Sequence, residues 1–101
     1  MKYDYVTFVK KAPGVWVADP GVPTATFPNR ETALYKLNEV HGLHKGLGWS
    51  GNHGVESVTR ILFGGERKNT DDLDCFFEYT FAPMNDASIH KRYRVAILPR
   101  K

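Results

Sequence analysis

One segment with helical periodicity stands among strand-type segments, and this pattern most constrains the fold of the 101-residue chain. Asn29 is a typical N-cap residue and Glu31 follows in the first turn, while apolar residues recur at positions 33, 34, 37 and 40. This spacing predicts an amphipathic helix starting at Asn29, and Gly42 predicts its C-terminal end. The fold must therefore bury the apolar face of this helix.

The other ordered segments are rich in aromatic and β-branched residues, which favour strands. The expected strands span residues 2–10, 15–19, 55–63, 73–81 and 92–98. Pro13 and Gly14 suit the central positions of a type II turn between the first two strands, whereas Pro23 and Pro28 keep the next segment irregular. Short connections favour antiparallel pairing. We therefore predict an α+β fold in the order ββαβββ, an antiparallel sheet of about five strands with one helix packed on one face.

The composition is that of a folded protein, expected to form a single domain over residues 1–101. Hydrophobic residues make up 42% and charged residues 25%, which excludes an intrinsically disordered chain. Cys75 is the only cysteine, so no disulfide forms within one chain. No apolar run reaches the length of a signal peptide or a membrane span. We expect a cytoplasmic protein that does not enter a membrane.

A glycine-rich stretch, HGLHKGLGWSGNHG, covers residues 41–54. It contains the pattern G-x-G-x-x-G, but a helix precedes it and a strand follows, the reverse of the order in dinucleotide-binding folds. His41, His44 and His53 are imidazole donors, but their spacing matches no strong zinc pattern. We expect no metal and no cofactor. The stretch is predicted to be a helix C-cap followed by a mobile loop that presents or tucks in Trp49, with His41 and His44 on the surface near the helix end.

Catalytic machinery is not expected around Cys75. Alternation in the strand 73–81 places Cys75 on the apolar face, where it is a small buried side chain rather than a nucleophile. The acidic residues of this region fall on the opposite face, which we expect to be solvated: Asp72, Asp74 and Glu78. The sequence therefore predicts a protein that is not an enzyme.

Positive charge is concentrated at the C-terminal end of the sequence. The net charge is +3, but residues 90–101 hold five basic residues and no acidic ones: Lys91, Arg92, Arg94, Arg100 and Lys101. A strand of this kind contacts phosphates in proteins that bind single-stranded nucleic acid, with Tyr93 or Trp49 available for stacking on bases. Charged residues on an edge strand also prevent pairing with other chains. Nucleic-acid binding through these residues is therefore the alternative function.

Protein–protein binding is the function that the sequence favours. The last strand is apolar on both faces, since Val95 and Ile97 alternate with Ala96 and Leu98. One helix covers only one face of a sheet, so we expect a protein partner or a second copy, forming a dimer, on the other. The candidate partner-binding residues are Trp49, His44, Lys91, Arg92 and Arg94. The small size and the lack of enzyme motifs also fit a phage-encoded inhibitor of a host system.

Four short pieces of the chain resemble DUF4177-type domains, a family of very small bacterial proteins of unknown function. The matching pieces are Met1–Tyr5 (MKYDY), Leu37–Asn38, Gly54–Val58 (GVESV) and Tyr93–Arg100 (YRVAILPR). Val55 stands at the position where the family has Trp. The resemblance implies a small α+β sheet with a helix across it, and it carries over no catalytic residue.

Overall fold

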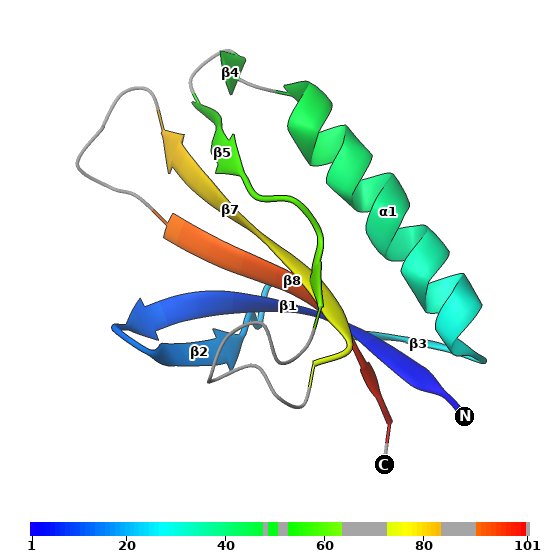
Figure 1. Cartoon of the computed structure of the whole chain (residues 1–101). Helices are drawn as coiled ribbons and strands as arrows, with labels where there is room; N and C mark the ends of the chain where they lie inside the picture. Colours follow the sequence, from blue (N-terminus) through cyan, green and yellow to red (C-terminus); the bar gives the residue numbers. More distant parts are fainter. Residues whose placement is uncertain (48, 51–52, 64–72, 84–90, 101) are drawn as a thin grey trace.

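The computed structural model describes residues 1–47, 49–50, 53–63, 73–83 and 91–100. Its elements are, in chain order, β1 (Tyr3–Ala12), β2 (Val15–Ala18), β3 (Ala25–Phe27), α1 (Arg30–Leu47), β4 (Trp49–Ser50), β5 (His53–Val58), β6 (Leu62–Phe63), β7 (Cys75–Pro83) and β8 (Lys91–Pro99). The strands form one sheet in the order β2-β1-β8-β7-β5-β4, with β3 added to β1 and β6 to β7. All of these strand pairs are antiparallel, and α1 lies across one face of the sheet (Figure 1).

The α+β fold class is confirmed, because one helix packs on an antiparallel sheet in the described part of the chain. Three short strands, β3, β4 and β6, are added to the predicted set. The segment 25–27 was expected to be extended but irregular, and it forms a short strand that pairs with residues 3–5 of β1. The predicted strand 55–63 is divided into β5 and β6, since Thr59 lies between them and donates its N–H to the carbonyl oxygen of Glu78 at 2.9 Å.

The start of α1 is as predicted. Oδ1 of Asn29 accepts hydrogen bonds from the backbone N–H and from the hydroxyl of Thr32, both at 2.9 Å. These bonds occupy a helix-terminal N–H that would otherwise lack an intrahelical partner. The apolar positions then meet the sheet: Ala33 and Leu37 are fully buried, and Leu34 and Val40 pack beside them.

The predicted end of α1 at Gly42 is wrong, because the helix continues to position 47 and Gly42 has no positive φ. The packing of two histidines against the sheet explains why the helix continues past Gly42. The His44 ring lies against Tyr79 with ring centroids 4.4 Å apart, and His41 meets Phe77 edge-on at 5.0 Å. His41 and His44 are therefore half-buried rather than on the surface. Packing against the sheet outweighs the low helix propensity of glycine, about 1 kcal/mol.

Gly42→Ala is expected to raise the free energy of unfolding by about 0.5–1 kcal/mol. A Cβ at Gly42 meets no atom within 4 Å, so alanine gains helix propensity without a clash. Gly14→Ala is the matched opposite, since Gly14 has a φ of +75° in the β1–β2 turn, where alanine is strained. Urea unfolding measures both variants. A loss of stability in Gly42→Ala would contradict the helical assignment.

The sheet carries an apolar cluster on each face. The cluster beneath α1 contains Ala33, Leu37, Cys75, Phe77, Val95 and Ile97. The cluster on the opposite face contains Leu62, Phe76 and Ala96, with Phe8 and Leu73 packed against it. Ala96 is thus buried within the chain itself, whereas Leu98 on the same side of the last strand is half-buried, and a second copy on this side stays a prediction.

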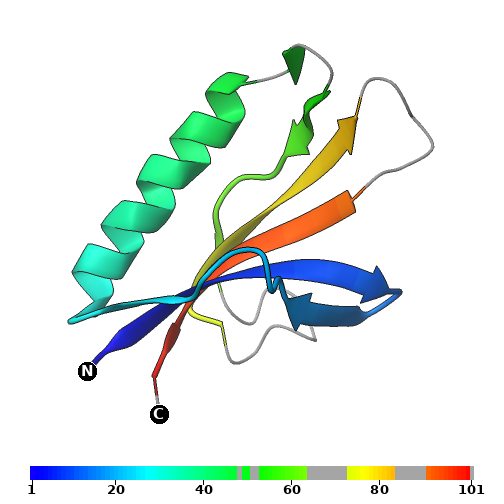
Figure 2. The same cartoon turned by 180° about the vertical axis from the view of Figure 1, so that it is seen from behind.

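The β1–β2 hairpin end projects away from α1, as the front and rear views both show (Figures 1 and 2). The chain ends lie together elsewhere on the sheet, where the backbone N–H of Arg100 donates to the carbonyl oxygen of Lys2 at 2.9 Å. The hairpin end is therefore a part of the sheet that α1 leaves uncovered. Among the described residues, no helix combines the length and the apolar character that a membrane span requires.

Candidate functional site

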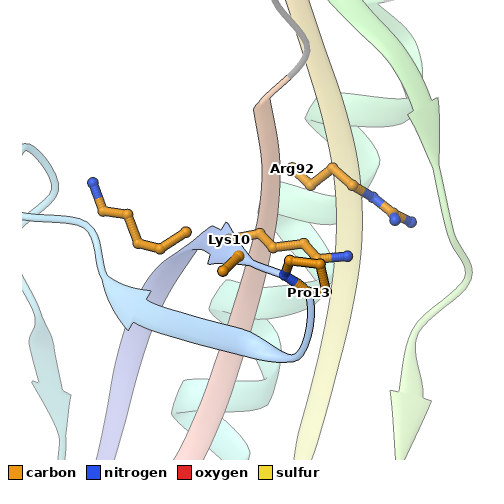
Figure 3. A pocket seen from close by; sticks show the side chains of 5 residues that line it. Lys10, Pro13 and Arg92 are labelled. Carbon is orange, nitrogen blue, oxygen red and sulfur yellow. The ribbon is translucent and has the colours of Figure 1, made fainter.

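A shallow pocket of about 230 Å³ lies where the β1–β2 hairpin meets the beginning of β8 (Figure 3). Its shape follows from the turn: Ala12 and Val15 pair across Pro13 and Gly14, and the positive φ of Gly14 is that of the third position of a type II turn, as predicted. The pocket is lined by Lys10, Lys11, Ala12, Pro13 and Arg92.

The pocket is basic. Lys10, Lys11 and Arg92 contribute three positive charges, and none of the described acidic residues lines it. The β1–β8 pairing explains why these charges meet, because it runs as far as Val9 opposite Tyr93, and Lys10 and Arg92 are the next residues of the two strands. Within the described residues, none of the three cations forms a salt bridge. As far as the described residues go, the pocket therefore presents positive charge that no carboxylate neutralises.

Arg94 was expected to contact a partner or nucleic acid, and its position corrects this expectation. Its side chain is buried, with only 4% of the residue exposed. Nε and Nη2 of Arg94 both donate to Oε2 of Glu78, at 3.0 and 2.7 Å, and the guanidinium lies 4.2 Å from the centre of the Trp16 ring. Glu78 is equally buried at 4%, so the face expected to be solvated instead contains a buried ion pair. Arg94 therefore anchors β2 through Trp16.

β2 follows the turn that lines the pocket, and its outer edge faces away from β1 and β8. β2 is the last strand in the order of the sheet, and no other described strand pairs with its outer side. Val15 and Val17 are 48% and 37% exposed, whereas Trp16 between them turns to the opposite face and covers Arg94. An exposed apolar edge strand is a template for pairing with another chain.

The glycine-rich stretch does not form the predicted loop. α1 occupies it as far as Leu47, and Trp49 lies in β4, where it pairs with Gly54 of β5. His44 donates from Nδ1 to the carbonyl oxygen of Val40 at 2.8 Å. His44 is thus a packing residue between α1 and the sheet. That Trp49 contacts a partner stays a prediction. Among the described residues, no three side chains of His, Cys, Asp or Glu gather as metal ligands do.

The predicted basic set is spread over β8 rather than gathered at one place. Lys91 and Arg92 are exposed beside the pocket. Arg100 lies beyond the other end of the strand, roughly 25 Å away at the usual rise per residue, and its Nη1 donates to Oγ1 of Thr26 at 3.1 Å. Lys101 lies outside the described residues. The described charges therefore do not form one continuous track.

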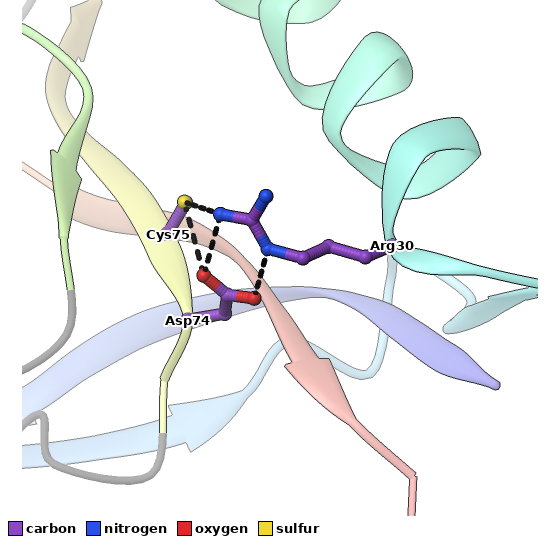
Figure 4. Close-up of polar contacts among 3 residues, drawn as sticks. All are labelled: Arg30, Asp74 and Cys75. Atoms are coloured by element: carbon purple, nitrogen blue, oxygen red, sulfur yellow. Dashed lines mark hydrogen bonds and ion pairs between the residues drawn. The ribbon is translucent and has the colours of Figure 1, made fainter. Parts of the chain in front are cut away.

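Cys75 lies in a polar network at the beginning of β7 (Figure 4). Arg30 of α1 donates from Nε to Oδ2 of Asp74 at 2.6 Å and from Nη2 to Oδ1 at 3.1 Å, and the Cys75 thiol donates to Oδ1 at 3.3 Å. The bond to Arg30 lowers the pKa of the Asp74 carboxyl. Burial, and then the bond to Asp74, raise the pKa of the Cys75 thiol to about 11. The thiol is therefore held in its protonated form at neutral pH, and this network ties α1 to β7.

The sequence reasoning missed Lys10, Lys11 and Pro13 as site residues. A signal for them exists, since two lysines directly before a Pro-Gly turn must stand at a hairpin end. What the sequence did not show was that β1 pairs with β8, which brings Arg92 to the same end. The basic residues of the C-terminal segment were therefore assessed without their neighbours from β1.

Comparison with known proteins assigns the chain to no family. No protein-family model matches the chain. No curated protein and no solved structure matches it either. The resemblance to DUF4177-type domains stays a prediction, and the function must be argued from the geometry of the hairpin end and the β2 edge.

Proposed function

We propose that this protein is a small, non-enzymatic binding module that acts through protein–protein contacts, and that it pairs an extended segment of its partner with the outer edge of β2. The observation that carries the proposal is the combination of an open strand edge with the exposed side chains of Val15 and Val17. In strand addition, main-chain hydrogen bonds supply affinity and alternate side chains supply specificity.

The outer edge of β2 is favoured as the binding site because the strand lacks the features that usually protect a sheet edge. Natural edge strands are usually protected by charges or proline within the strand. The sequence of β2 is VWVA, which has neither, although Pro13 lies in the turn before it and Asp19 and Pro20 follow it directly. β2 is also held firmly, because Trp16 rests on the buried Arg94 guanidinium. A rigid edge loses little conformational entropy when a partner strand pairs with it.

Replacing Val15 and Val17 together with lysine is expected to weaken binding of an extended peptide at least tenfold. Lysines on an edge strand oppose pairing, and tenfold corresponds to about 1.4 kcal/mol, the scale of one or two net hydrogen bonds. Peptides selected on the wild-type protein from a random display library are titrated by fluorescence anisotropy against both proteins. Amide chemical-shift changes locate the binding site, and sedimentation reports whether wild-type copies pair with one another through the same edge.

Leu43→Lys is the matched control, because Leu43 is an exposed apolar residue of α1, far in sequence from β2. This variant should bind the selected peptides as the wild type does. Equal affinity of the β2 double variant and the control, with shift changes outside β2, would refute strand addition at this edge.

Single-stranded nucleic acid is the second candidate ligand, and the basic pocket is the observation that favours it. Lys10, Lys11 and Arg92 line this pocket at the hairpin end, and the exposed Lys91 precedes Arg92 in the chain. Phosphate contacts make affinity fall steeply with salt, whereas an apolar edge responds weakly. The salt dependence of oligonucleotide binding therefore separates the two functions.

A further inference from the structure

The basic pocket at the hairpin end has no role in strand addition by itself, yet it adjoins the strand that the proposed function uses. Ala12 lines the pocket and pairs with Val15, the first residue of β2. A partner strand on the outer edge of β2 therefore has one end beside the pocket. A side chain at that end has to reach past the turn to the cations, because Lys10 and Lys11 lie on β1, next to β2, and Arg92 lies on β8, one strand further.

The three cations of the pocket repel one another, and a bound anion would offset this repulsion. Lys10 and Arg92 follow the last paired residues of two adjacent strands, so they carry like charges on neighbouring positions. Like charges facing each other across strands destabilise a sheet. The nearby Glu78 carboxylate is buried with Arg94 on the sheet and does not line the pocket. Among the described residues no carboxylate neutralises the pocket, so an anion from another molecule would fit it.

We propose that the pocket binds carboxylate side chains, so that the partner segment paired with β2 is acidic at the end beside the Pro13–Gly14 turn. This inference rests on the proposed function and names the class of partner. A second copy of the chain is disfavoured as occupant by its own net charge of +3. A nucleic acid is disfavoured because Arg94 is buried and Arg100 lies at the far end of β8, which leaves a compact cluster rather than a track for a phosphate backbone.

The probes are two synthetic peptides of alternating Thr and Val that differ only in carrying glutamates or glutamines at one end. We expect the glutamate peptide to bind wild-type protein about five- to tenfold more tightly, the effect of two or three exposed ion pairs. The preference should shrink at high salt, where the screening length falls to a few ångströms. In the variant Lys10→Gln with Arg92→Gln the two peptides should bind equally, with the affinity of the glutamine peptide unchanged.

The control for charge alone is Lys2→Gln with Lys45→Gln, which removes two exposed cations that do not line the pocket. This control should keep the preference for glutamate, and circular dichroism confirms that both double variants are folded. A preference lost equally in the control and in the pocket variant would mean that only net charge matters and would overturn the site.

The remaining outcomes separate the two proposals. Equal affinity for both peptides, lost in the β2 edge variant, would overturn the carboxylate site and leave the proposed function standing. Binding of neither peptide would count against the proposed function, and the pocket inference would fall with it. If a single-stranded oligonucleotide bound more tightly than the glutamate peptide and lost affinity in the pocket variant, the carboxylate assignment would be replaced by phosphate.

Discussion

Replacing Arg94 with alanine is expected to lower the free energy of unfolding by about 3–5 kcal/mol, because it removes one partner of a buried ion pair. The two side chains are each only 5% exposed, and both hydrogen bonds of the pair, at 3.0 and 2.7 Å, would be lost. The Trp16 ring also loses the guanidinium on which it packs. Urea unfolding followed by tryptophan fluorescence measures the change.

Arg92→Ala is the matched control, since Arg92 lies two residues away on the same strand and is exposed. It should change stability by no more than about 0.5 kcal/mol. The double variant Glu78→Leu with Arg94→Met should recover most of the loss, because paired apolar side chains replace a buried ion pair at little cost. If Arg94→Ala cost no more than Arg92→Ala, the buried pair would not be a stabilising feature.

Phe77→Ala is the second substitution with a large expected effect, a loss of about 3–5 kcal/mol. Phe77 is fully buried at the centre of the cluster under α1. Its ring contacts those of His41 and His44, with centroids 5.0 and 5.7 Å away, so truncation opens a cavity beneath the C-terminal half of the helix. Thermal and urea unfolding quantify the loss.

Tyr35→Ala tests whether the effect comes from burial rather than from removing an aromatic ring, because Tyr35 is 73% exposed on α1. We expect a change within about 0.5 kcal/mol for this control. Domains of this size have a total stability of about 5–15 kcal/mol, so Phe77→Ala alone would leave a marginal fold. A Phe77→Ala protein as stable as Tyr35→Ala would contradict the placement of α1 on the sheet.

The buried pair and the candidate binding surface are connected through Trp16. Arg94 holds Trp16 on one side of β2, and this arrangement leaves Val15 and Val17 exposed on the other side of the same strand. Loss of Arg94 should therefore weaken peptide binding at the β2 edge as well as stability. Both the stability of the fold and the shape of the binding edge would then depend on Arg94. This double role explains why a charged residue lies in the interior here.

Local structure was largely predictable from the sequence. The Asn29 cap, the apolar face of α1 and the Pro13–Gly14 turn each depend on residues within a few positions of one another. Cys75 was correctly placed on the buried face of its strand by alternation alone. The extent of α1 was not predictable in this way, because the packing of His44 on Tyr79 outweighs the local preference of Gly42 to end a helix.

The sequence by itself determined the types of the main elements and the fold class, since propensity, capping and turn chemistry act between near neighbours. Tertiary structure decided which strands lie side by side, and with that the candidate site. The β1–β8 pairing brings Lys10 beside Arg92, and the β7–β8 register places Glu78 opposite Arg94. The described basic residues of the C-terminal segment look alike in the sequence but have different surroundings, because burial and charge pairing depend on partners far away in the chain.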